Sequence, residues 1–83
     1  MNETEVREKL RQFILTDLIK DLKYALTDDE GIVSGGLIDS FSLAEIGVFA
    51  EQEFNVYIPD PDLTKAKMNT LNLMVARVMR DLK

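Results

Sequence analysis

The sequence predicts an all-α fold: a small antiparallel bundle of three main helices plus one short helix. Apolar residues recur every three or four positions along three stretches of the chain, which is the spacing of one helix face. Strand signals are absent apart from residues 56–58, a run too short to indicate a sheet. With 83 residues, the chain is expected to form a single domain spanning residues 1–83.

The first helix is predicted from about Glu3 to about Tyr24. Asn2 and Glu5 suit a capping pair at its start. Its apolar stripe consists of Val6, Leu10, Phe13, Ile14 and Leu18, widened by Leu15, Ile19, Leu22 and Leu26. Residues 27–31 end the helix, and a loop follows. Four apolar residues of that loop are expected to pack beneath the bundle: Ile32, Val33, Leu37 and Ile38.

The second helix is predicted from about Ser40 to Phe54, with Asp39 as its N-cap and the Ser42 amide as the group that Asp39 accepts. Its core-facing stripe consists of Leu43, Ile46, Gly47, Ala50 and Phe54. A different face, of mixed polarity, carries Phe41, Glu45, Val48 and Gln52.

Two prolines, Pro59 and Pro61, require the chain to leave the helix, and residues 62–66 are expected to form the short third helix. The last helix is predicted to begin near Asn69 or Thr70, either of which can cap it. Its buried stripe consists of Leu71, Met74, Val75, Val78 and Leu82. Basic residues suit its C-terminal end: Arg77, Arg80 and Lys83.

The composition excludes most enzyme chemistry. The chain has no cysteine and no histidine, so it lacks the thiolate nucleophile, the commonest general base and the commonest metal ligands. We therefore expect no catalytic residue, no metal site and no independent enzyme activity. Residues 28–31 lack the ligand spacing of a calcium loop. No membrane span or signal peptide is visible, so a cytoplasmic location is expected.

The charge is concentrated in the middle of the chain. Residues 39–62 contain six acidic residues and no lysine or arginine, within a net charge of −5 for the whole chain. Such a segment repels nucleic acid and attracts basic protein surfaces. A charged face kept only for solubility is the simpler alternative.

One serine, Ser40, is the candidate site of covalent attachment in this sequence. Ser40 lies between a glycine-marked loop and the start of a helix, where a hydroxyl is exposed and an attached phosphate is favoured by the helix dipole. Residues 39–41, Asp-Ser-Phe, resemble the Asp-Ser-Leu attachment motif of acyl carrier proteins. Residues 51–60 and 62–71 are similar to the family's second helix ending and third helix, in the same order.

The resemblance implies an acyl-carrier-protein-like fold in which a phosphopantetheinyl transferase moves 4′-phosphopantetheine from coenzyme A onto Ser40. The arm's thiol then carries an acyl, aminoacyl or peptidyl thioester in fatty acid, polyketide or nonribosomal peptide type biosynthesis, with a leaning toward a specialised pathway. Asp39 belongs to the motif as the helix cap, and Ser42 is the rival attachment site. The resemblance also implies a monomer whose partner face docks basic loading ligases, synthases or transferases. That face comprises Phe41, Glu45, Val48, Glu51 and Gln52.

Two departures from the family pattern are informative. Phe41 replaces the usual leucine, which is expected to narrow the choice of partners. Gly47 lies on the core face, and two explanations are open: with Ala50 it leaves space for a cargo chain, or it admits Phe13 or another large side chain from the first helix. The alternative function is a helical protein-interaction module of the same fold without the prosthetic group.

Overall fold

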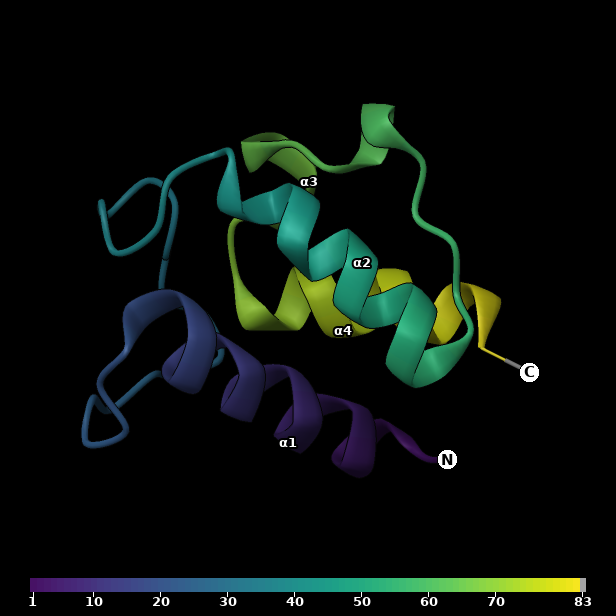
Figure 1. Ribbon diagram of the computed structural model, residues 1–83, viewed down its shortest axis with the longest axis horizontal. Coiled ribbons are helices and arrows are strands. Elements are labelled where there is room, and N and C mark those ends of the chain that lie inside the picture. Colours follow the sequence, from purple (N-terminus) through teal and green to yellow (C-terminus); the bar gives the residue numbers. More distant parts are fainter. Residues whose placement is uncertain (83) are drawn as a thin grey trace.

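The computed structural model describes residues 1–82, which contain helices and connecting segments and no strand. The main helices are α1 (Glu3–Phe13), α2 (Ser42–Phe54) and α4 (Leu71–Asp81). A π-helical segment, η1 (Ile14–Ile19), extends α1. Two short elements, the 3₁₀ helix η2 (Asp60–Asp62) and the helix α3 (Lys65–Met68), connect α2 to α4 (Figure 1). The predicted all-α bundle of three main helices is confirmed.

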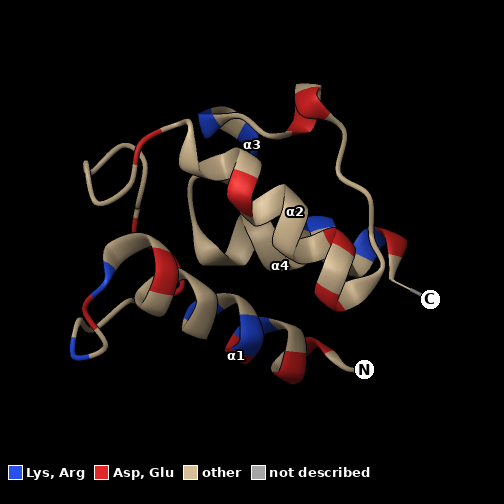
Figure 2. Cartoon of the chain, in the orientation of Figure 1, with Lys and Arg blue, Asp and Glu red and all other residues tan. Residues whose placement is uncertain are grey.

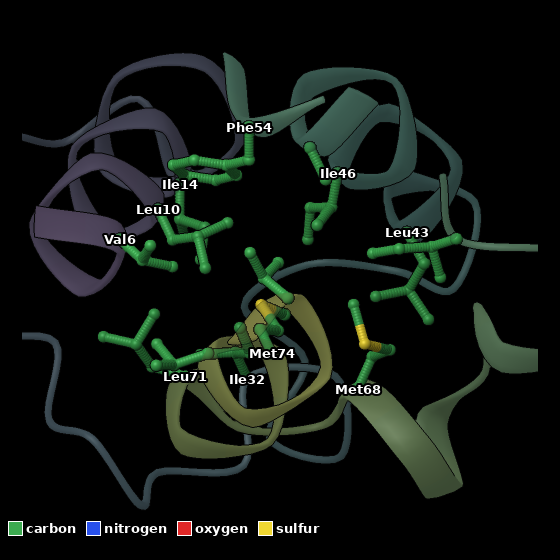
Figure 3. Packing of buried hydrophobic residues seen from close by; sticks show 14 of the residues in the cluster. Val6, Leu10, Ile14, Ile32, Leu43, Ile46, Phe54, Met68, Leu71 and Met74 are labelled. Atoms are coloured by element: carbon green, nitrogen blue, oxygen red, sulfur yellow. The ribbon is translucent and has the colours of Figure 1, made fainter. Parts of the chain in front are cut away.

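The apolar stripes of the three main helices meet in one core (Figure 3). The predicted stripe of α2 is entirely buried, and so is that of α4 apart from the half-buried Leu82. Residues outside the main helices complete the core: Leu26, Ile32, Ile38, Val56, Ile58 and Met68. No polar side chain is buried among the described residues, so burial of apolar surface is the main term that holds the bundle together.

The first helix ends earlier than the sequence indicated. It begins as predicted, with Asn2 Oδ1 accepting from Glu5 N at 2.9 Å. The predicted end at Tyr24 is wrong, because Lys20 takes a left-handed conformation (φ 61°) that ends η1 and reverses the chain. Leu22 fits the helical spacing but is 64% exposed, whereas Leu26 reaches the core from the loop.

The start of α2 is tighter than a regular α-helix. The helix begins at Ser42, two residues later than predicted, and residues 39–44 form i→i+3 hydrogen bonds. The N-cap position is therefore Phe41 and not Asp39 as predicted, although Asp39 does accept from the Ser42 amide. In this first turn, the amides of Ser42, Leu43 and Ala44 donate to the carbonyls of Asp39, Ser40 and Phe41 at 3.2–3.3 Å. Ser40 is therefore held on a closed turn immediately before the helix.

The prediction of a short helix over residues 62–66 is wrong in its bounds. Pro61 favours the 3₁₀ helix η2 ahead of that range, and α3 begins only at Lys65, after the extended Thr64. Burial of Met68 extends α3 beyond residue 66. Thr70, one of the two predicted caps, starts α4, and its Oγ1 accepts from Leu73 N at 3.1 Å. The basic residue Lys83 lies outside the described residues.

None of the helices in residues 1–82 combines the length and the hydropathy that crossing a membrane requires.

Candidate functional site

The loop that leads to Ser40 is fixed by one side chain from the junction of α3 and α4. Asn69 Oδ1 accepts from the amides of Val33 and Ser34 at 3.1 and 2.9 Å, and its Nδ2 donates to Ser34 Oγ at 3.0 Å. The backbone carbonyl of Asn69 also accepts from Ile32 N at 2.9 Å. Because these contacts join residues more than 30 positions apart, they hold the loop against the bundle.

The same loop turns back toward α2 at Gly36. This residue has φ 81°, a conformation that glycine adopts without steric cost. After the turn, the amides of Leu37 and Ile38 donate to Ile32 O at 3.0 and 3.1 Å. Ile32 and Ile38 are buried, as predicted, so the next residues of the chain emerge at the surface from a fixed point.

Asp39 distinguishes the two serines that follow it. Its Oδ1 accepts from Ser42 N at 3.0 Å and from Ser42 Oγ at 3.2 Å. Ser42 is half-buried, and its hydroxyl is engaged in this contact. Ser40 is exposed, and within the described residues its hydroxyl makes no hydrogen bond. An enzyme can therefore reach the Ser40 oxygen without breaking a contact.

An open hollow lies beside Ser40. It has a volume of about 740 Å³, and we call it the Ser40 hollow. Leu18 from η1 and Val33 and Leu37 from the loop form its apolar wall, and Ser40 also lines it. Lys65 from α3 contributes the positive charge among its described lining residues.

The residues of the expected partner face are all exposed, and they lie on α2 and the turn before it. Phe41 is 83% exposed next to Ser40. Glu45, Val48 and Gln52 border a second depression, about 530 Å³, between η1 and α2. Glu51 lines a smaller depression, about 190 Å³, together with Val48 and Tyr57. Phe41 and Val48 are the large apolar side chains that this surface exposes.

Acidic residues lie on α2 and in the segment that follows it (Figure 2). Of the six acidic residues in 39–62, Glu53 pairs with Lys9 and Asp62 pairs with Lys67 and Arg77. Hydrogen bonds from Lys67 and Arg77 hold the pKa of Asp62 below its ordinary value. The other four form no ion pair within residues 1–82: Asp39, Glu45, Glu51 and Asp60.

A side chain from outside the first helix lies beside Gly47, which corrects one of the two explanations offered for this residue. A Cβ atom at Gly47 would lie 2.9 Å from Leu63 Cδ1, so the glycine accommodates a side chain from the segment after η2. Phe13 instead stacks on Phe49, with ring centroids 4.3 Å apart. A hollow of about 190 Å³, lined in part by Gly47 and Leu63, remains beside α2, so space for a cargo chain stays a prediction.

Two site residues were missed from the sequence. Lys65 was assigned to a short helix without a role, and Asn69 was considered only as a cap. Both act through tertiary contacts that no local pattern indicates. In residues 1–82 no cluster of acidic side chains is arranged to hold a metal ion.

Comparison with known proteins identifies the kind of molecule. The chain is 29% identical over 73 residues to a D-alanyl carrier protein of Leuconostoc citreum. The aligned region covers 88% of this chain and 91% of that protein. A D-alanyl carrier protein of Leuconostoc mesenteroides is 27% identical over 74 residues, covering 89% and 92%. No family model and no solved structure matches the chain.

The helical bundle and these relatives define a small carrier protein, whose role is to be acted on by partner enzymes. The similarity to these two relatives supports a carrier protein of the acyl-carrier-protein type, as the resemblance of the sequence indicated. It is a carrier and not an enzyme, as the sequence indicated.

Proposed function

We propose that Ser40 carries a 4′-phosphopantetheine arm, which a phosphopantetheinyl transferase attaches from coenzyme A. The Ser40 oxygen attacks the phosphorus that bears the pantetheine, and a new oxygen–phosphorus bond replaces the one to adenosine 3′,5′-bisphosphate. The bisphosphate leaves, and the hydroxyl proton passes to a base of the transferase. The observation that carries this proposal is the exposed, unbonded hydroxyl of Ser40 beside the engaged hydroxyl of Ser42.

The arm supplies the chemistry that the chain lacks. Because the sequence has no cysteine, a thioester on this protein requires an added thiol. The terminal thiol of the arm attacks the carbonyl carbon of an activated cargo, a carbon–sulfur bond replaces the bond to the activating group, which leaves, and the thiol proton passes to a base of the loading enzyme. The bundle provides the surface on which partner enzymes dock. Asp39 fixes the turn that presents Ser40, through its two contacts with Ser42.

The cargo that the relatives favour is an amino acid. Both curated relatives are named D-alanyl carrier proteins, so an aminoacyl thioester is the first class to test. Acyl and peptidyl cargoes, of fatty acid, polyketide or nonribosomal peptide type biosynthesis, are the alternatives. We favour a specialised pathway because Phe41 departs from the usual leucine of the attachment motif.

We propose that partners approach along α2 through Phe41, Glu45, Val48, Glu51 and Gln52. Exposed aromatic and apolar side chains are typical of contact surfaces, and the unpaired carboxylates attract basic enzymes. The expected partners are the transferase and a loading ligase, synthase or further transferase, which a single-domain, cytoplasmic monomer would meet one at a time.

Intact mass spectrometry tests the attachment. The protein is incubated with coenzyme A and a broad-specificity phosphopantetheinyl transferase, and the expected result is a mass increase equal to one arm. Ser40→Ala should abolish the increase, whereas the matched variant Ser42→Ala should keep it. No increase with a competent transferase, or an increase that survives Ser40→Ala, would overturn the proposal.

The same mass measurement distinguishes the carrier from the alternative function, a protein-interaction module. A protein-interaction module of this fold would keep the acidic surface and the exposed Phe41, yet it would never gain mass. That reading is favoured only if the folded protein stays unmodified while still binding a basic partner.

A further inference from the structure

The Ser40 hollow combines a cation, an apolar wall and the proposed attachment oxygen. We propose that it seats the first part of the attached arm, with the Lys65 ammonium group paired to the phosphodiester and the pantoyl methyl groups against Leu37 and Val33. This inference rests on the proposed function, because it requires the arm on Ser40.

The electrostatics of the first turn make Lys65 the partner for the phosphate. A phosphodiester adds a negative charge beside Asp39, in a segment that already carries six acidic residues and no basic one. The first three amides of α2 donate within their own turn, so they are not free to bind the phosphate. Lys65 lines the hollow and lies immediately beyond the acidic segment.

Lys65 is also the lysine of α3 that has no competing contact. It forms no ion pair within residues 1–82, whereas Lys67, two positions on, is held by Asp62 at 2.8 Å. A charged hydrogen bond from an ammonium group to a phosphate oxygen is stronger than a neutral one. Of the two lysines of α3, Lys65 is therefore the one whose ammonium group is free to pair with the phosphodiester.

The apolar wall suits the group that follows the phosphate in the arm. The pantoyl unit carries two methyl groups on one carbon, and the side chains of Leu18, Val33 and Leu37 are half-buried at the wall of the hollow. Its volume, about 740 Å³, is in the range of small-molecule sites. The arm is tethered at a residue that lines the hollow, so weak contacts suffice because the local concentration of a tethered group is high.

The proposal is tested by NMR spectroscopy of the arm in the loaded protein. An arm labelled with ¹³C and ¹⁵N is attached to the wild type, to Lys65→Gln and to the matched control Lys67→Gln, which removes a lysine of the same helix. We expect nuclear Overhauser effects between the pantoyl methyls and the methyls of Leu37 and Val33. In Lys65→Gln, the ratio of seated to free arm should fall about two- to fivefold, as expected for loss of an exposed ion pair.

Salt provides a second readout. Raising the ionic strength should reduce the seated fraction of the wild type to that of Lys65→Gln, because exposed charges are screened. Lys67→Gln should match the wild type at each salt concentration. Identical arm signals in all three proteins, or an absence of contacts to the apolar wall, would overturn the inference.

The two proposals fail in different ways. If intact mass shows no arm on Ser40, the proposed function fails before this experiment begins. If the arm is attached but moves freely in the wild type, only the seating in the Ser40 hollow is wrong.

Discussion

The two sides of α1 are built differently. Toward α4, α1 makes the most extensive helix–helix contact of the described bundle, and polar side chains reinforce it. Arg7 Nη1 donates to Asn72 Oδ1 at 2.5 Å, and Asn72 N donates to Asp28 O at 3.0 Å. Toward α2, Phe13 stacks on Phe49 and Lys9 pairs with Glu53 at 2.8 Å, and two depressions of about 530 and 350 Å³ remain along this contact.

This difference separates the packed side of the bundle from the side that presents the candidate site. The side formed by α1 and α4 is closed by apolar packing and loop contacts. The side of α2 is open at its N-terminal half, where Ser40 and Phe41 are exposed. The N-terminal end of α2 is therefore accessible, while the apolar stripe of the same helix is buried in the core.

The largest effect is expected from shortening a side chain on the closed side. Leu10 is fully buried, so Leu10→Ala should lower the free energy of unfolding by about 3 kcal/mol, measured by urea denaturation. Phe49→Ala, on the open side, should cost less, about 1–2 kcal/mol, because Phe49 is half-exposed. A larger loss for Phe49→Ala than for Leu10→Ala would contradict the comparison.

A smaller effect is expected at the loop before Ser40. Asn69→Ala leaves the amides of Val33 and Ser34 without their acceptor, which should cost about 1–2 kcal/mol and speed hydrogen exchange at both amides. Attachment of the arm to Ser40 should slow as well, because the loop no longer fixes its position. Asn69→Asp keeps the accepting oxygen and serves as the control. Unchanged exchange in Asn69→Ala would show that other contacts hold the loop.

Acid is expected to weaken the contact between η2 and α4. Lys67 and Arg77 hold the pKa of Asp62 below its ordinary value of 3.8. A lowered pKa in the folded protein means that this stabilisation is present above pH 3.8 and is lost as the pH falls through the folded value. Asp62→Asn should therefore flatten the fall of the melting temperature at acid pH. An unchanged pH profile in Asp62→Asn would contradict this assignment.

The smallest effect is expected at Gly47. Gly47→Ala gains about 1 kcal/mol of helix propensity but requires the end of the flexible Leu63 side chain to move. The two terms nearly cancel, so the melting temperature should change little. Gly47→Leu, by contrast, must displace Leu63 and should destabilise the protein. A large loss in Gly47→Ala would show that Leu63 cannot move.

The sequence predicted the elements whose signals are local. Helical spacing and capping residues located the start of α1, the core face of α2 and the beginning of α4 at Thr70. The end of the first helix was missed because Leu22 fits the helical spacing, and nothing local shows that the chain reverses at Lys20. Spacing alone gives no information about such a reversal.

In the candidate site too, the features set by neighbouring residues were predicted and those set by tertiary contacts were not. The exposure of Ser40 and the contact of Asp39 with Ser42 follow from neighbouring residues and were predicted. Lys65 lies 25 positions after Ser40, and Leu63 reaches Gly47 across a loop, so both contacts depend on the tertiary fold. Periodicity identified the core face at Gly47 but not the side chain that fills it.

Peptide mapping of the loaded wild-type protein tests the central claim most directly. Proteolysis followed by tandem mass spectrometry locates the arm within residues 39–42, where two serines compete. We predict that the arm is on Ser40 and that Ser42 is unmodified, because only the first hydroxyl is exposed and free of Asp39. An arm found on Ser42, or a folded protein that the transferase leaves unmodified, would contradict the account.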